Sequence, residues 1–505
     1  MKKFFTNLTF ATGLVFVLTI TSFIIAQTGA LALAIVPIIL LALILLVMII
    51  RDPSLGFLMI IFFLPFERVP TYEVGGINIK INTILGFVTI IAWVLALLFN
   101  GKKYKVQPNA LSIPLCVFVL ALLVSLTQAL NFTRAAAVLF FVIFTVVLSV
   151  LTVNMVKDME SLKKTVAVLF ASSILVGIFS FFQFGGDVVG LPRSITLLKQ
   201  GYDSKVFGFP RVQAFSMEPL YLANYLLIPL SLSFSYFLAQ IKAGDLGENS
   251  LITKRWFVVA LSALLLVIFI LTVSRGGYLG LIATFAIFML FYFKRIFTWR
   301  NITIGLVTVA IVISGVFYAL SKGEYRATEE FIGHVTLNDM NKGESVQGRL
   351  ATFKFALGAY KWNPNFGIGI GNYGPYAKNY PPVAPKTGWD IVNNQYIEVL
   401  VETGLFGLAS FLLILLILTI RSLAAIRYCQ DPFVKATLIG LLAAFVGVLV
   451  QYNFFSTLYI IHIWVLIGLL VAVQTMALKS KKYKVQSEKY KTNSGSLEYG
   501  NLNLK

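Results

Sequence analysis

Three arginines lie close to the ends of apolar segments, where a fixed positive charge is costly. Arg211 lies in GFPRVQAFSMEP, Arg275 lies in TVSRGGYLG between two apolar runs, and Arg349 follows Gly348 in a polar segment. An arginine near hydrocarbon usually faces a cavity or a partner. Its planar guanidinium binds phosphate oxygens bidentately and stays charged at any working pH. We therefore interpret the three arginines as a site for an anionic group, most plausibly the pyrophosphate of a lipid carrier.

Each arginine also has a structural interpretation, which the sequence leaves open. Arg275 could extend to the outer headgroups, Arg211 could pair with Glu218, and Arg349 could be a solvated residue at a helix start. The SRGG sequence places Arg275 at a tight turn rather than in a free flank, which favours binding. Four other basic residues are interpreted as ordinary interface residues: Arg193, Lys199, Lys205 and Lys354.

Three carboxylates are candidates for acid–base chemistry. Glu218 directly precedes Pro219, so it either caps the N-terminus of a span or acts in the site. Glu398 and Glu402 are four residues apart and share one helix face. Glu402 lies about one turn into an apolar run, where a carboxylate is a functional candidate, although a hydrogen-bonded structural role is equally open.

The segment from Gln347 to Gly407 joins a polar loop to an apolar helix. Residues 348–362 have helical spacing, which predicts a helix lying at the membrane surface with Leu350, Phe353, Leu357 and Tyr360 on its apolar stripe. The following GIGIGNYG has no phosphate-loop lysine and follows no strand, so it does not indicate a nucleotide site. The two histidines lie far from any cluster with zinc-ligand spacing, so we predict no metal site.

The composition is that of a membrane protein. Of 505 residues 58% are hydrophobic and 12% are charged, and the mean hydropathy is +0.86. We predict an all-α polytopic membrane protein with about 12–14 transmembrane helices and a large outward-facing loop that contains the surface helix. The expected spans lie near 8–26, 31–50, 54–66, 79–99, 110–130, 134–153, 162–184, 219–240, 255–273, 276–293, 299–319, 397–421, 433–451 and 455–477.

The basic residues predict the orientation. Most flank the spans on one side of the membrane, which places both termini in the cytoplasm. Arg68, Lys80 and Arg134 would then lie on the outer side and count against this orientation. Segments 67–78, 185–218 and 320–396 then face outward. The net charge of +20 indicates contact with anionic lipid rather than nucleic acid. We expect an integral membrane domain over residues 1–478, with a retained first span, and a basic, disordered tail over 479–505.

Four features occur in a fixed order across roughly residues 160–475. They are R-x-x-x-F-x-x-E-P at Arg211, SRGG at Arg275, Gly348-Arg349 with the following FGIGIGNY, and NNQYIEVLVETGLFG. This arrangement resembles the bacterial family of O-antigen ligases and polymerases, which are integral membrane glycosyltransferases. The resemblance implies a polyprenyl-pyrophosphate-linked glycan donor, a glycan or lipid-linked acceptor, and an active site on the outer face of the cytoplasmic (inner) membrane.

The resemblance also implies the site residues and partners. Arg211, Arg275 and Arg349 would bind the pyrophosphate, and no metal or other cofactor is expected. Besides membrane lipids and the two substrates, a chain-length regulator is a possible partner. The candidate catalytic residues are Glu218, Glu402, Asn393, Asn394 and Tyr396.

One position departs from the family pattern. Ligase-type members usually have His-Asn-x-Tyr, and this chain has Asn393 in place of the histidine. An amide is not a general base near neutral pH, so a base would have to come from Glu218, Glu402 or Glu398. The departure favours a polymerase or an atypical transferase. A transporter or flippase of lipid-linked saccharide and a catalytically inactive relative stay open as alternatives.

Overall fold

The computed structural model describes residues 30–68, 71–74, 77–99, 106–107, 109–203, 209–239, 251–321, 344–379 and 390–479. The protein is an all-α polytopic membrane protein. Eight described helices are long and apolar enough to cross a membrane, and four shorter helices are apolar. The expected first span, most of the basic tail, Lys205 and His334 lie outside the described residues, so the count of 12–14 spans stays a prediction.

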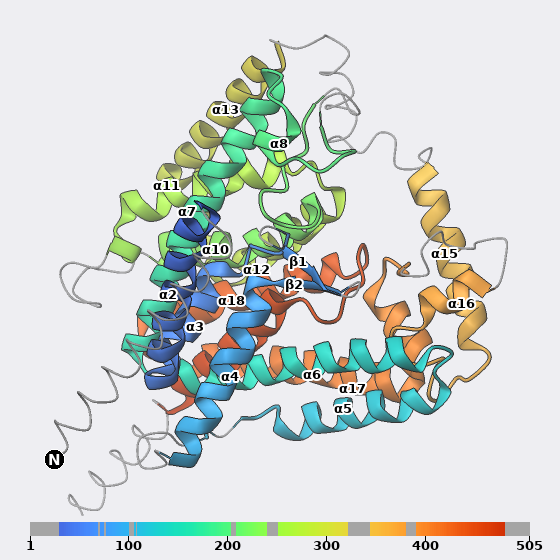
Figure 1. Ribbon diagram of the computed structural model, residues 1–505. Helices are drawn as coiled ribbons and strands as arrows, with labels where there is room; N and C mark the ends of the chain where they lie inside the picture. Colours follow the sequence, from blue (N-terminus) through green and yellow to red (C-terminus); the bar gives the residue numbers. More distant parts are fainter. Residues whose placement is uncertain are drawn as a thin grey trace, which may run out of the picture. The chain divides into compact units, whose positions relative to one another are not determined.

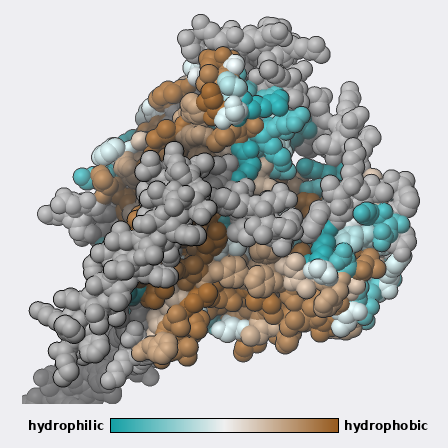
Figure 2. Space-filling model, viewed as in Figure 1, coloured by the Kyte–Doolittle hydropathy of each residue, from teal (hydrophilic) through white to brown (hydrophobic). Residues whose placement is uncertain are grey.

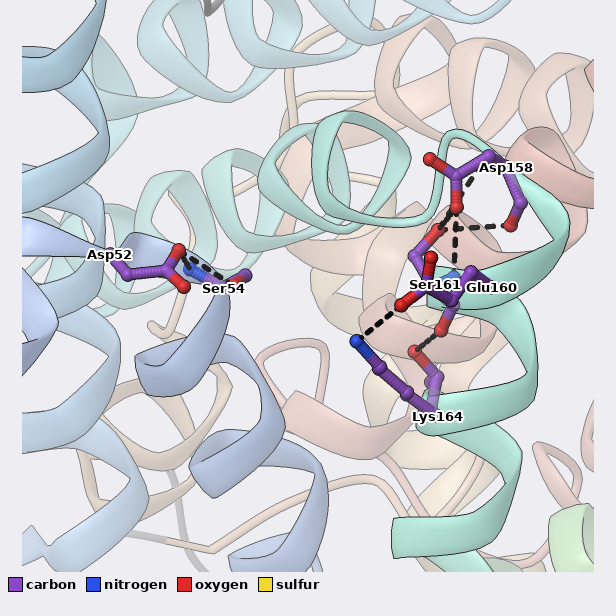
Figure 3. Close-up of polar contacts among 7 residues, drawn as sticks. Asp52, Ser54, Asp158, Glu160, Ser161 and Lys164 are labelled. Atoms are coloured by element: carbon purple, nitrogen blue, oxygen red, sulfur yellow. Dashed lines mark hydrogen bonds and ion pairs between the residues drawn. The ribbon is translucent and has the colours of Figure 1, made fainter.

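The chain divides into two compact units. The first contains residues 1–57 and 85–104. Its described part consists of α2 (Ala30–Arg51), the start of α3 (Pro53–Phe63) and most of α4 (Ile81–Phe99). Asp52 precedes α3, and its carboxylate accepts the Ser54 backbone N–H at 3.1 Å and the Ser54 hydroxyl at 2.7 Å (Figure 3). The Asp52 carboxylate thus provides a hydrogen-bond acceptor for one of the backbone N–H groups that the start of a helix leaves without a partner.

The second unit contains residues 58–84 and 105–505, and it is a helical bundle (Figure 1). Among the eight described candidate spans, α10 (Pro219–Ala239) is the most buried. It packs against α18 (Pro432–Gln451), α11 (Arg255–Leu271) and α12 (Arg275–Ile296). The described helices of the second unit are α5 (Ser112–Ser125), α6 (Phe132–Met155), α7 (Met159–Val188), α8 (Arg193–Thr196), α10, α11, α12, α13 (Trp299–Ser321), α15 (Glu344–Tyr360), α16 (Tyr373–Asn379), α17 (Gln395–Tyr428), α18 and Ile461–Lys479. Two 3-10 turns, Leu126–Gln128 and Leu251–Thr253, accompany them.

Local sequence signals set where α7 begins. The Asp158 carboxylate accepts the Ser161 N–H at 2.8 Å, and the Ser161 hydroxyl oxygen accepts the Asp158 N–H at 3.2 Å, which is a capping box. One turn further, Lys164 and Glu160 form an exposed ion pair (Figure 3). Polar side chains outside the apolar run therefore fix the entry of this span.

The outer surface of the bundle is apolar where α5 and α17 lie (Figure 2). Side chains such as Ile113 on α5 and Leu416 on α17 are more than half exposed. Hydrophilic residues gather instead over α15 and α16. An exposed apolar surface on two adjacent helices is what contact with lipid requires.

The structure differs from the sequence expectations in three places. A two-stranded antiparallel hairpin, β1 (Thr71–Val74) with β2 (Ile77–Lys80), lies in the segment 67–78 that we expected to face outward and extends into the start of the span expected from residue 79. The last span begins at Ile461 rather than 455, because turns precede it. In α15 the expected apolar face is partly wrong.

On α15, Leu350 and Leu357 are exposed, although both belong to the expected stripe. The buried residues of this helix are Ala356 and Ala359, which form a core with residues of the following loop and α17. Phe355, expected off the stripe, packs against that core. Small residues let the backbone of α15 approach its neighbours closely, which a hydrophobicity pattern does not detect.

Candidate functional site

The Arg211 loop, residues 209–218, is held in place by buried contacts from α7. The side-chain oxygen of Gln183 accepts the backbone N–H groups of Gln213 at 3.0 Å and Ala214 at 2.9 Å. The guanidinium of Arg211 lies 5.6 Å from the ring centroid of Tyr202. Because the loop is anchored through its backbone, the position of the Arg211 side chain is fixed by the fold.

Arg275 is the first residue of α12. Its position is set by the cap of this helix and by glycines of α12 that pack closely against α18 and the residues after it. Ser274 caps α12 by accepting the Gly277 N–H at 3.3 Å. Added side-chain carbons at Gly276 and Gly280 would meet α18 and the residues that follow it. Close packing of small residues of this kind is common between membrane helices. The SRGG sequence therefore combines a cap, a charge and a packing surface.

The structure brings the three arginines and Glu218 into one electrostatic environment, which we call the arginine group. Arg211, Arg275, Arg349 and Glu218 are all half-buried. The charges of Glu218 and Arg275 act on both Arg211 and Arg349. Burial lowers the pKa of the Arg211 and Arg349 guanidinium groups, and Glu218 acts in the opposite direction. Among these four described residues, three are cationic and one is anionic, an arrangement whose potential is positive.

The residues of the NNQY sequence mainly build the start of α17. Asn394 is the helix cap, and its side-chain oxygen accepts the N–H groups of Tyr396 and Ile397, each at 3.1 Å. The hydroxyl of Tyr396 donates to the Leu449 carbonyl at 2.7 Å. Asn393 has a φ of 59°, a left-handed conformation that asparagine tolerates better than most residues. These contacts explain the residue types without chemistry.

A second polar site, the carboxylate group, contains Glu398, Glu402 and Arg134. The oxygens of Glu402 accept the N–H groups of Gly371 at 2.7 Å and Tyr373 at 3.0 Å. One oxygen of Glu398 accepts the Val392 N–H at 2.7 Å and the Ser456 hydroxyl at 2.5 Å. The charges of both glutamates act on Arg134.

The cavity between these residues measures about 60 Å³. A cavity of this size has room for a few water molecules, because one water needs roughly 10–15 Å³ of such volume. The carboxylate group therefore binds mainly the protein's own backbone.

The GIGIGNYG loop fills a break in α17. Gly404 has φ 67° and ψ −168°, which interrupts the helix. The N–H groups of Ile368 and Gly369 donate to the carbonyls of Val401 (3.0 Å) and Glu402 (2.9 Å) before the break. After it, the Leu405 N–H donates to the Pro364 carbonyl at 2.9 Å. The loop thus supplies partners to both ends of the interrupted helix, as the low-polarity surroundings demand.

Residues 260–412 match a family model described as O-Antigen ligase. This segment, about 30% of the chain, is similar to the O-antigen ligase family. A search of the curated proteins gives no match.

The O-antigen ligase segment contains most of the expected site. Arg275, Arg349, Asn393 and Glu402 fall inside it, together with the loop that bonds to the break in α17. Arg211 and Glu218 fall outside, and only the fold brings them to the arginines of the segment.

Two features of the protein were missed by reasoning from its sequence. Arg134 was counted only as a charge that disagrees with the orientation, and it lies beside the carboxylate group. Glu67 and His462 form a buried pair, with Oε1 and Nδ1 3.5 Å apart. A glutamate directly after an apolar run was the available signal for Glu67. His462 lies within an apolar run, and nothing in its spacing indicates a partner.

Proposed function

We propose that the protein is a membrane glycosyltransferase that uses a polyprenyl-pyrophosphate-linked glycan on the outer face of the cytoplasmic membrane and polymerises or ligates that glycan. One observation carries the proposal. Arg211, Arg275 and Arg349 come from three separate elements, are half-buried, and share one electrostatic environment with Glu218. Guanidinium groups that lie close together bind the oxygen atoms of a phosphate or pyrophosphate through several charge-assisted hydrogen bonds.

The reaction is a displacement at the anomeric carbon of the donor glycan. The acceptor hydroxyl oxygen forms a bond to this carbon while the bond to the pyrophosphate oxygen breaks, and the electron pair leaves with the pyrophosphate. The three arginines stabilise the negative charge that grows on the departing group. Glu218, beside the arginines, accepts the proton of the acceptor hydroxyl. Arginine and carboxylate chemistry is sufficient for these steps.

The other predicted catalytic residues take positioning roles in this proposal. Glu402 holds the GIGIGNYG loop through two backbone N–H groups. Asn394 caps α17, and Tyr396 bonds to α18 through Leu449. Asn393 orients the chain before the cap. Cytoplasmic termini and a chain-length regulator as partner belong to the same proposal.

The test is replacement of Arg275 in purified, reconstituted protein supplied with the carrier-linked glycan of the native host. We expect Arg275→Ala to lower glycan transfer by roughly 100-fold or more, because removing one donor to a developing charge typically costs 10²–10³ in rate. Arg275→Lys keeps the charge but loses the planar fork, so transfer should be intermediate. The matched control is Arg300→Ala, which removes an exposed arginine at the start of α13.

Normal transfer by Arg275→Ala, with the protein folded in the membrane, would refute the arginine site. The alternative function, movement of a lipid-linked saccharide across the membrane, gains one observation, since α17 is broken as helices in transporters often are. Sealed vesicles distinguish the two. Transfer of glycan without vectorial movement supports the enzyme, and movement of intact donor without transfer supports the transporter.

A further inference from the structure

A cavity of about 380 Å³ lies within the second unit, and one of its lining residues, Tyr221, feels the charge of Glu218. Its polar lining includes Glu67, Lys80, Asn82 and Tyr459. Its apolar walls come from α6 and the start of the last helix. Sites for small ligands usually measure roughly 300–1,000 Å³ and combine apolar walls with a few polar groups. The cavity is therefore of the size and composition of a ligand site.

Two oxygen atoms of the lining residues have no hydrogen bond of ordinary geometry within the part of the chain that the structure describes, although the Met217 backbone N–H acts on the Glu67 carboxylate. They are Oε2 of Glu67 and Oδ1 of Asn82. The residues are only 4% and 1% exposed, respectively. A buried oxygen without a donor costs roughly 1–3 kcal/mol, and more when it is charged. Both atoms are acceptors, so a ligand that satisfies them must donate hydrogen bonds.

A chain of hydrogen bonds keeps Glu67 in place. Gln451 Oε1 accepts from Asn224 Nδ2 at 2.7 Å, which turns Asn224 Oδ1 towards His462 Nε2, also 2.7 Å away. Nε2 must then carry a proton. The Nδ1 atom of His462 faces Glu67 Oε1 at 3.5 Å, so the histidine lies directly against the carboxylate.

The charge of Glu67 is favoured by its neighbours. Burial by itself raises the pKa of the Glu67 carboxyl, but the hydrogen bond and charge of His462 and the charge of Lys80 lower it further, so that the net shift is downward. Tyr221 and Tyr459 are the other titratable groups in the cavity wall. Lys80 makes a cation an unfavourable ligand, whereas a neutral hydroxyl group meets no such repulsion.

We propose that this cavity is the subsite for the acceptor sugar, with Glu67 and Asn82 accepting hydrogen bonds from its hydroxyl groups. Lys80 and Tyr459 can donate to the sugar oxygens. Met217 lines the cavity, and the next residue, Glu218, belongs to the arginine group. An acceptor bound there would lie beside the proposed base and the proposed donor site. The proposal rests on the proposed function, because it names the substrate that the second half of the reaction uses.

The experiment measures binding without transfer. Full-length protein in detergent is applied to a printed array of bacterial oligosaccharides that carry no pyrophosphate. We expect the wild type to bind a subset of these glycans and Glu67→Gln to bind at least tenfold more weakly. Glu160→Gln is the matched control, because it makes the same change on an exposed helix surface. Arg275→Ala should bind the same glycans as the wild type, since no pyrophosphate is present.

A second variant protects the test against misfolding. Ala137 lines the cavity from α6, so Ala137→Phe fills the space while Glu67 and His462 are kept. It should also lose glycan binding. Absence of binding by the wild type, or equal binding by Glu67→Gln and the wild type, would overturn the subsite. Failure of the donor site is a separate result, seen as unchanged transfer by Arg275→Ala.

Discussion

The arginine group and the carboxylate group are built from similar residue types, but they differ in what satisfies them. In the carboxylate group, Glu402 and Glu398 accept four hydrogen bonds, three of them from backbone N–H groups. In the arginine group, three positive charges share their surroundings with one glutamate. Among the described residues, the carboxylates of the first group have hydrogen-bond donors from the protein itself, whereas the second group brings together three cations and one anion. The difference teaches that the partner, rather than the residue type, separates a structural site from a binding site.

The largest expected effect tests the structural side of this comparison. Gly404→Ala places a side chain at φ 67°, ψ −168°, where it would also overlap the Asn365 carbonyl. Strain at such a backbone position costs roughly 1–3 kcal/mol before the overlap is counted. We expect most folded protein to be lost, measured as the monodisperse peak in size-exclusion chromatography. Gly358→Ala, on an open face of α15, is the control and should retain that peak.

The next effect tests the binding side. Arg349→Ala should lower glycan transfer by roughly 100-fold, which is about 2.7 kcal/mol in transition-state stabilisation, with little change in thermal stability. Removing one of several like charges relieves repulsion with Arg275. Rates and melting temperatures of the purified protein check both parts. A large fall in melting temperature would mean that the arginine is structural, and the comparison would fail.

Glu402→Gln distinguishes structure from catalysis at the carboxylate group. The amide keeps one acceptor, but its NH₂ would face a backbone N–H of the GIGIGNYG loop. Hydrogen bonds to a charged group are worth roughly 1.5–3 kcal/mol, so we expect a lower melting temperature and a parallel loss of transfer. Glu160→Gln should change neither. Loss of transfer at an unchanged melting temperature would instead assign Glu402 to catalysis.

The smallest effect concerns the helix cap. Asn394→Ala removes the acceptor for two N–H groups at the start of α17 and should cost about 1 kcal/mol of stability. Asn394→Asp and Asn394→Ser keep an acceptor and should restore most of it. Thermal unfolding of the three variants measures this series. Complete loss of transfer in the stable Asp variant would show a function beyond capping.

The spans were largely predictable from the sequence. Pro219–Ala239 and Pro432–Gln451 agree with their expected limits within a residue, because long apolar runs in lipid must form helices to bond their own backbone. The break at Gly404 was not predicted. It depends on a loop some 35 residues earlier, whose backbone bonds to the interrupted helix.

Residue types in the site were predictable, and their partners were not. The sequence by itself determined that this is a membrane protein of helices, that three arginines stand where charge is costly, and that asparagine occupies the position of the family's histidine. Only the tertiary structure decided that Glu218 joins the arginines, that Glu402 bonds to a loop, and that Glu67 and His462 meet. The physical reason is that apolar runs are local, whereas a buried charge is defined by neighbours that lie far along the chain.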